Sequence, residues 1–143
     1  MLFFNKKKKA DATNLDKKYI QFLSEVDAEY MRAFSTKSMR VLKNYLSREC
    51  AVELSSIIFA AGSRYFGADK FRTTQWTLLS SDNNVLTILK DVTFDKVKVA
   101  GSLYIEVADN YKEVWQLDVN QKDFVICDII PYKRYSEMIG SLA

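Results

Sequence analysis

The chain has 143 residues, of which 48% are hydrophobic and 27% charged, and it contains only 4 glycines and 1 proline. This composition is typical of one folded domain with a sizeable core and excludes an intrinsically disordered chain. Lys6–Lys9 contribute four positive charges to a net charge of +3, so the remaining residues together carry −1. The sequence therefore predicts no basic face for nucleic acid.

Residues 1–11 are predicted to form a flexible basic tail. The order of MLFFNKKKK, apolar residues before lysines, is the reverse of a secretory signal. The apolar part is too short to span a membrane, and Leu2 excludes N-myristoylation. We expect a cytoplasmic protein that is at most peripheral to a membrane. One hypothesis is a weak, salt-sensitive contact with anionic lipid, and the alternative is a disordered solubilising end. The residues for the membrane contact are Leu2, Phe3, Phe4, Lys6, Lys7, Lys8 and Lys9.

The first half of the chain has the three- and four-residue apolar spacing of helices. The first predicted helix begins near Thr13, with Asp16 completing a capping signal, and runs to the polar sequence STKS at 35–38. That sequence also caps a short second helix. A third helix begins at Ser47, and Gly67 is well placed to end it.

After Asp69 the apolar period changes to two, which is typical of strands. The predicted strand segments are 70–80, 85–94, 96–107, 111–119 and 123–130. The turn cluster SSDNN at 80–84 separates the first two segments, and NQK at 120–122 predicts a hairpin turn. Gly101 interrupts the alternation of the third segment, where we expect a β-bulge or bend.

Helices followed by antiparallel strands indicate an α+β fold, with the N-terminal helices packed on a curved antiparallel sheet of four to five strands. We expect a single domain over residues 12–132. Residues 133–143 are predicted to form a C-terminal tail or a short helix.

Histidine is absent, which removes the commonest general base and the commonest transition-metal ligand. Ser-His and Cys-His nucleophiles and the usual zinc sites are therefore excluded. Cys50 and Cys127 form no CxxC pair and no disulfide framework, which fits a reducing compartment. The sequence predicts no cofactor and no metal.

The segment EVDAEYMRAFSTKSMRVLKNYLSREC resembles the opening of the nuclear transport factor 2-like superfamily. Members have a helix ending in an Ala-aromatic pair, as Ala33-Phe34 here, and then a short helix ending in Leu-x-x-Tyr-Leu-Ser, as in Leu42 to Ser47. The hairpin EVWQLDVNQKDFVICDII resembles the close of the Tim-forty-four-like branch. The resemblance covers residues 15–131 and implies a cone-shaped fold. The expected loop at 109–112 is short for that branch and its long amphipathic region is missing, so its membrane and motor functions do not carry over.

The resemblance implies that the mouth of the cone often holds a small ligand. The candidate lining residues are the aromatics Tyr30, Tyr65, Trp76, Tyr104 and Trp115. The alternative is that these side chains fill the core. Asp128 alternates with Phe124, Ile126 and Ile130, so its carboxylate is expected on an apolar strand face or, alternatively, solvated or paired near the strand end.

Two functions remain open from the sequence. The first is a non-catalytic binding or scaffolding module that self-associates through its sheet as a homodimer or binds a protein partner. The second is a protein that binds a small hydrophobic ligand, or a histidine-free enzyme that uses Asp128 and a tyrosine in the cone. The lack of histidine and of a convergent polar set favours the first.

Overall fold

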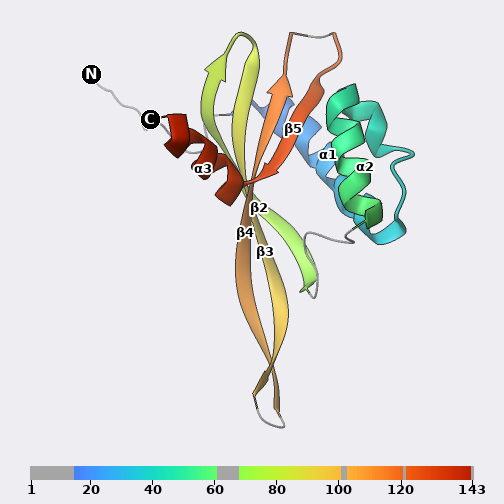
Figure 1. The fold of residues 1–143 in the computed structure, drawn as a ribbon, viewed down its shortest axis with the longest axis vertical. Helices are drawn as coiled ribbons and strands as arrows, with labels where there is room; N and C mark the ends of the chain where they lie inside the picture. The colour runs from blue at the N-terminus through green and yellow to red at the C-terminus, as the bar shows by residue number, and fades with distance from the viewer. Residues whose placement is uncertain (1–14, 61–67, 101–102, 121, 143) are drawn as a thin grey trace.

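The computed structural model describes residues 15–60, 68–100, 103–120 and 122–142 (Figure 1). The helices are α1 (Lys17–Thr36), the 3₁₀-helix η2 (Leu42–Tyr45), α2 (Arg48–Ala60) and α3 (Tyr132–Leu142). The strands are β2 (Ala68–Asp82), β3 (Val85–Ala100), β4 (Leu103–Asp118) and β5 (Val125–Pro131). They form one antiparallel sheet in the order β2-β3-β4-β5, curved and not closed. The predicted α+β class is confirmed, with four strands in the described part of the chain.

Helix α1 begins and ends at residues whose local chemistry favours a boundary. Asp16 is its N-cap, and the Asp16 carboxylate accepts a hydrogen bond from the Lys18 backbone N–H at 3.4 Å. Lys37 ends the helix in the left-handed conformation, with φ 58°, and its N–H donates to the Ala33 carbonyl. The helix therefore begins at Lys17, later than the predicted start near Thr13, and Asp16 is its N-cap and not a residue of its first turn. Thr13 itself lies outside the described residues.

The second predicted helix is only a turn of 3₁₀-helix, η2, before the chain extends at Leu46. Ser47 then connects α2 to the sheet. Its N–H donates to the Ile126 carbonyl at 2.9 Å, and its hydroxyl accepts from the Cys50 N–H at 3.2 Å. Ser47 therefore caps α2 as the sequence predicts, while the expected stop at Gly67 lies outside the described residues.

The turn between β2 and β3 consists of Asn83 and Asn84, with φ values of 51° and 66°. Two consecutive positive φ values define the type I′ geometry that matches the twist of a two-residue hairpin, and asparagine adopts it more readily than most residues. The predicted turn at 80–84 is confirmed and narrowed to these two residues.

The strand predicted over 96–107 is wrong, because two strands share it. Ala100 pairs with Leu103 and Lys96 pairs with Val107, so the chain reverses between β3 and β4. Residues 109–112, expected as a loop, pair within β4. Figure 1 shows the resulting β3–β4 ribbon extending well past the helices. Alternation alone could not distinguish one bulged strand from two paired strands, because both keep the period of two.

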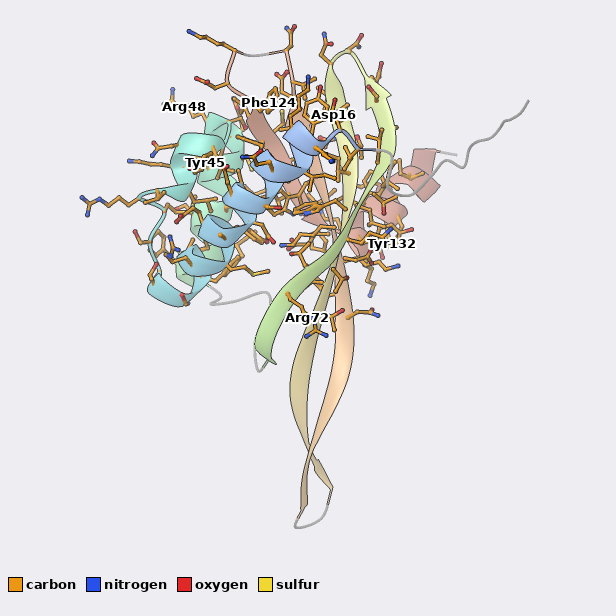
Figure 2. The ribbon with its side chains drawn as sticks, turned by 180° about the vertical axis from the view of Figure 1, so that it is seen from behind. Asp16, Tyr45, Arg48, Arg72, Phe124 and Tyr132 are labelled. Atoms are coloured by element: carbon orange, nitrogen blue, oxygen red, sulfur yellow. The ribbon has the colours of Figure 1, made fainter. Side chains whose placement is uncertain are left out.

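The helices lie on both sides of the sheet. Helices α1 and α2 cover one face, here called the inner face, and α3 lies against β4 and β5 on the other face, the outer face (Figures 1 and 2). The core between α1, α2 and the inner face includes, among the residues whose burial is described, Leu23, Val26, Ile88 and Trp115. At the end of α1 that carries Asp16, the Phe22 ring contacts Tyr45 and Phe124 at centroid distances of 6.0 and 5.5 Å (Figure 2).

A β-bulge in β5 changes which side chains face the core. Gln116 pairs with Asp128 but Leu117 pairs with Ile126, so Cys127 is the extra residue. Ile126 and Ile129 therefore both belong to the core. Asp128 pairs across the sheet with Gln116 and is half-buried, and its Oδ1 accepts from the Ile129 N–H at 3.0 Å. The bulge breaks the expected alternation of Asp128 with Ile126. Asp128 and Ile130, which pair with Gln116 and Val114, still share the outer face.

The surroundings of Cys127, the extra residue of the bulge, change the pKa of its thiol and hence its reactivity. Burial raises the pKa of the Cys127 thiol above its ordinary value, and the Asp118 carboxylate raises it further. We expect the alkylation rate of Cys127 in the native protein to increase with pH through a midpoint above that of an unperturbed thiol. Iodoacetamide labelling followed by peptide mass spectrometry measures this rate and separates Cys127 from buried Cys50.

Asp118→Asn provides the matched variant. The amide oxygen can still accept the hydrogen bond that Asp118 Oδ1 accepts from the Asn120 N–H at 2.9 Å. Because the substitution removes the negative charge, the labelling midpoint is expected to fall. An unchanged or higher midpoint would contradict the placement of Cys127 beside Asp118.

Candidate functional site

Three strands place a row of large polar and aromatic side chains under α1. In register across the sheet, Trp76 of β2 pairs with Lys90 of β3, and Lys90 pairs with Glu113 of β4. Asp27 and Tyr30 of α1 lie three residues apart on the buried face of the helix. The helix and the sheet therefore bring one cation and two carboxylates together in the interior. We call Lys90, Asp27, Glu113, Tyr30, Trp76 and Trp115 the Lys90 cluster.

Glu113 lies at the floor of the Lys90 cluster and has no exposed surface. Its Oε2 accepts a hydrogen bond from the Tyr30 hydroxyl at 2.6 Å, and its Oε1 accepts one from Trp115 Nε1 at 3.1 Å. The Lys90 ammonium lies 3.5 Å from Oε1. Both carboxylate oxygens thus have donors, as a buried charge requires.

Asp27 provides the second carboxylate, from the helix side. Its Oδ1 accepts from the Lys90 ammonium and its Oδ2 accepts from the Thr73 hydroxyl at 2.5 Å. Lys90 is fully buried and only 9% of Asp27 is exposed. Lys90 consequently joins α1 to β4 by ion pairs that are almost entirely removed from water.

Three aromatic rings complete the surroundings of the Lys90 ammonium. Its Nζ lies 4.8 Å from the Tyr30 ring centroid, 4.9 Å from Trp115 and 6.0 Å from Trp76. Trp115 packs edge-to-face against both Tyr30 and Trp76, with centroids 5.2 and 5.1 Å apart. Within about 6 Å, the electron-rich face of such a ring attracts a cation.

The structure brings together three of the six side chains that the sequence proposed for a cavity. Tyr30, Trp76 and Trp115 all belong to the Lys90 cluster. Tyr104 is nine residues along β4 from Glu113, which corresponds to about 30 Å of extended strand. Asp128 pairs with Gln116, outside the Lys90 cluster.

The remaining candidates lie outside the described residues. They are Tyr65 and the tail residues Leu2, Phe3, Phe4, Lys6, Lys7, Lys8 and Lys9.

The sequence analysis missed all three charged members of the Lys90 cluster. Each one interrupts an apolar stripe, and that was the available signal. Lys90 alternates with Leu86, Ile88 and Val92 in a strand. Asp27 likewise lies on the apolar face of α1, and Glu113 precedes Trp115 and Leu117 in the alternation of β4. Opposite charges that interrupt the buried faces of different elements suggest that they pair inside the protein.

The Lys90 cluster holds a cation but gives a substrate no access in this conformation. Lys90, Glu113, Tyr30 and Trp115 each have zero exposed surface. Within the described ranges, no group of three histidine, cysteine or acidic residues is arranged to hold a metal ion. Two carboxylates and three aromatic rings thus enclose the Lys90 ammonium, and within the cluster only Asp27 and Trp76 retain some exposed surface.

Replacing Lys90 with methionine tests the energetic role of the ion pairs. The substitution keeps an unbranched side chain of similar length but leaves Asp27 and Glu113 buried without their shared cation. We expect the free energy of unfolding to fall by about 3–5 kcal/mol, as for other buried pairs that lose one partner. Urea unfolding monitored by circular dichroism measures the change.

Lys112→Met is the matched control. Lys112 lies 3.8 Å from Asp91, and 45% of its side chain is exposed. Loss of the Lys112–Asp91 ion pair should lower the free energy of unfolding by less than about 1 kcal/mol, because water screens an exposed pair. Equal destabilisation by the two substitutions would contradict the importance of the Lys90 ion pairs.

Comparison with known proteins gives no further identification of the site. No family model, curated protein or solved structure matches the chain. The geometry of the Lys90 cluster and of the surface is therefore the basis for assigning a function.

Proposed function

We propose that the protein is a non-catalytic binding or scaffolding module that self-associates through its sheet. One observation carries this proposal: the space between α1 and the inner face is filled by the chain's own large side chains, with Trp115, Tyr30 and Lys90 fully buried. A catalytic or ligand-binding cavity would need a polar group that a solute can reach. Binding is therefore assigned to the exterior.

The arrangement of helices on a curved sheet supports a nuclear transport factor 2-like cone of the Tim-forty-four-like branch. Helices α1 and α2 cover the same face of the sheet, and the Trp-bearing strand β4 is followed by β5 in antiparallel pairing. On the outer face α3 covers only β4 and β5, and the part of that face formed by β2 and β3 is the proposed surface for self-association.

The outer face carries an apolar row that fits this use. Thr77, Leu89, Val114 and Ile130 pair in sequence across the four strands. Val114 and Ile130 are buried near α3, whereas Leu89 is only half-buried. Leu79, the extra residue at a register shift in the edge strand β2, is 41% exposed close to this row. A second copy would remove this uncovered part of the row from water.

The surface of α2 offers a further place for a protein partner. Val52 and Phe59, seven residues apart on this helix, are 64% and 59% exposed. Beside Val52 lies a pocket of about 410 Å³, whose lining includes Met39, Lys43 and Arg48. Apolar side chains beside cations suit an acidic, amphipathic surface on the partner.

We place the protein in the cytoplasm, with its basic tail as a weak contact to anionic membranes. None of the described helices is long and apolar enough to cross a membrane. The three apolar side chains can insert into the lipid surface, and the four lysines that follow are attracted to anionic head groups. One short signal of this kind gives only reversible membrane binding.

A second candidate function is a histidine-free enzyme or small-ligand-binding protein. The observation that favours it is the short hydrogen bond between the Tyr30 hydroxyl and the Glu113 carboxylate, at 2.6 Å in the interior. Such a donor–acceptor pair can bind a polar ligand or transfer a proton if the Lys90 cluster opens to solvent.

Self-association is tested by Leu79→Lys. We expect the wild-type protein to sediment as a dimer in analytical ultracentrifugation and Leu79→Lys to shift it towards monomer, because the lysine would place a charge in an apolar interface. Val52→Lys, at a more exposed apolar position on α2, should leave the dimer unchanged. A wild-type protein that remains monomeric at every concentration would contradict self-association.

The tail contact is tested by co-sedimentation with vesicles of phosphatidylcholine and phosphatidylglycerol. The full chain should pellet with these vesicles at low salt and be released at high salt, since screening weakens the attraction of the lysines. A chain that begins at Ala10 should stay in the supernatant. If both chains pellet equally, or neither does, the tail does not bind the membrane.

A further inference from the structure

We propose that the Lys90 cluster is a binding site for a primary ammonium ion, and that the chain's own Lys90 side chain occupies it. On this view, Lys90 is an internal ligand in a site built by the other members of the cluster. A small alkylammonium ion should therefore bind once the Lys90 side chain is shortened. This inference does not rest on the proposed scaffolding function.

The surroundings of the Lys90 ammonium have the composition of an ammonium receptor. Tyr30 and Trp115 approach Nζ at 4.8 and 4.9 Å, and Trp76 lies at 6.0 Å. Two tryptophans and a tyrosine are the rings that attract cations best, and the attraction increases when water is excluded. Asp27 and Glu113 add two negative charges beside the same nitrogen.

The carboxylates are held in place by donors other than Lys90. The Thr73 hydroxyl donates to Asp27 Oδ2, and the Tyr30 hydroxyl and Trp115 indole donate to the two oxygens of Glu113. The rings are also packed against one another, with Trp115 between Tyr30 and Trp76. The site is therefore preorganised, so that removal of the lysine side chain should leave its walls in position.

The chemistry of the site selects the class of ligand. A primary ammonium has three N–H donors, so it can donate to Asp27 and Glu113 together. A tetramethylammonium ion has a similar charge but no N–H to donate. Lys90→Ala removes three carbons and the terminal nitrogen, which is the size and shape of n-propylammonium. This ion is therefore the natural probe.

The experiment measures thermal unfolding of Lys90→Ala with increasing n-propylammonium chloride. We expect the Tm to rise with concentration and to recover at least half of the loss caused by the substitution, because a ligand that binds only the folded state stabilises it. Equal concentrations of 1-propanol and of tetramethylammonium chloride should have a much smaller effect. Wild-type protein, in which Lys90 fills the site, should not be stabilised.

Fluorescence gives a direct readout of binding, because the chain contains only two tryptophans and both line the site. We expect n-propylammonium to change the emission of folded Lys90→Ala in a saturable manner and to leave that of the wild type unchanged. A folded Lys90→Ala protein whose Tm and emission respond equally to n-propylammonium and tetramethylammonium would overturn the proposal.

Two further measurements apply if Lys90→Ala does not fold by itself. The double variant Lys90→Ala/Glu113→Gln leaves one buried carboxylate in place of two, and it should still be stabilised by n-propylammonium through Asp27. Refolding of either variant in n-propylammonium should also restore the native circular dichroism spectrum, whereas 1-propanol should not. The proposal would be overturned if n-propylammonium restored the native circular dichroism spectrum of neither variant.

Discussion

The burial of the Lys90 ammonium between Asp27 and Glu113 is the constraint on which the rest of the structure depends. These three charges come from α1, β3 and β4, and each would cost several kcal/mol if it were buried without its partners. A shift of α1 by one residue would rotate Asp27 by about 100° away from Lys90. We infer that the ion pairs, together with the hydrogen bonds that Tyr30 donates to Glu113 and that Asp27 accepts from Thr73, select one orientation of α1 on the sheet.

The same constraint determines which surfaces are left for function. Tyr30, Trp76 and Trp115 are packed around the charges, and of the charged members of the Lys90 cluster only Asp27 retains a small exposed surface. The exposed apolar side chains are instead found outside, at Val52 and Phe59 on α2 and at Met138 and Ile139 on α3. The buried charges thus occupy the interior, and the exposed apolar side chains are left on α2 and α3.

The long β3–β4 ribbon is the part of the fold least supported by the core. Among the described residues, the pairing of β2 with β3 reaches Lys96, and that of β5 with β4 begins at Glu113. Beyond the pair formed by Lys96 and Val107, the described ribbon consists of β3 and β4 alone. Isolated two-stranded ribbons are marginally stable in water. The ribbon therefore extends the molecule without contributing to the Lys90 cluster.

The sequence by itself determined the features that depend on neighbouring residues: the 3.6-residue apolar period of α1, the Ser47 cap of α2, the Asn83-Asn84 turn and, from their order, the α+β class. Only the tertiary structure decided which face of each strand is buried. In β3 both alternations are apolar, Val85 and Leu89 on one face and Leu86 and Ile88 on the other, so adjacent Lys90 and Asp91 were equivalent in sequence. The reversal between Ala100 and Leu103 and the bulge at Cys127 likewise depend on the partner strand. The charges of the Lys90 cluster interrupt apolar stripes in the sequence, but this signal does not say which charges pair, and only the convergence of three elements makes their burial favourable.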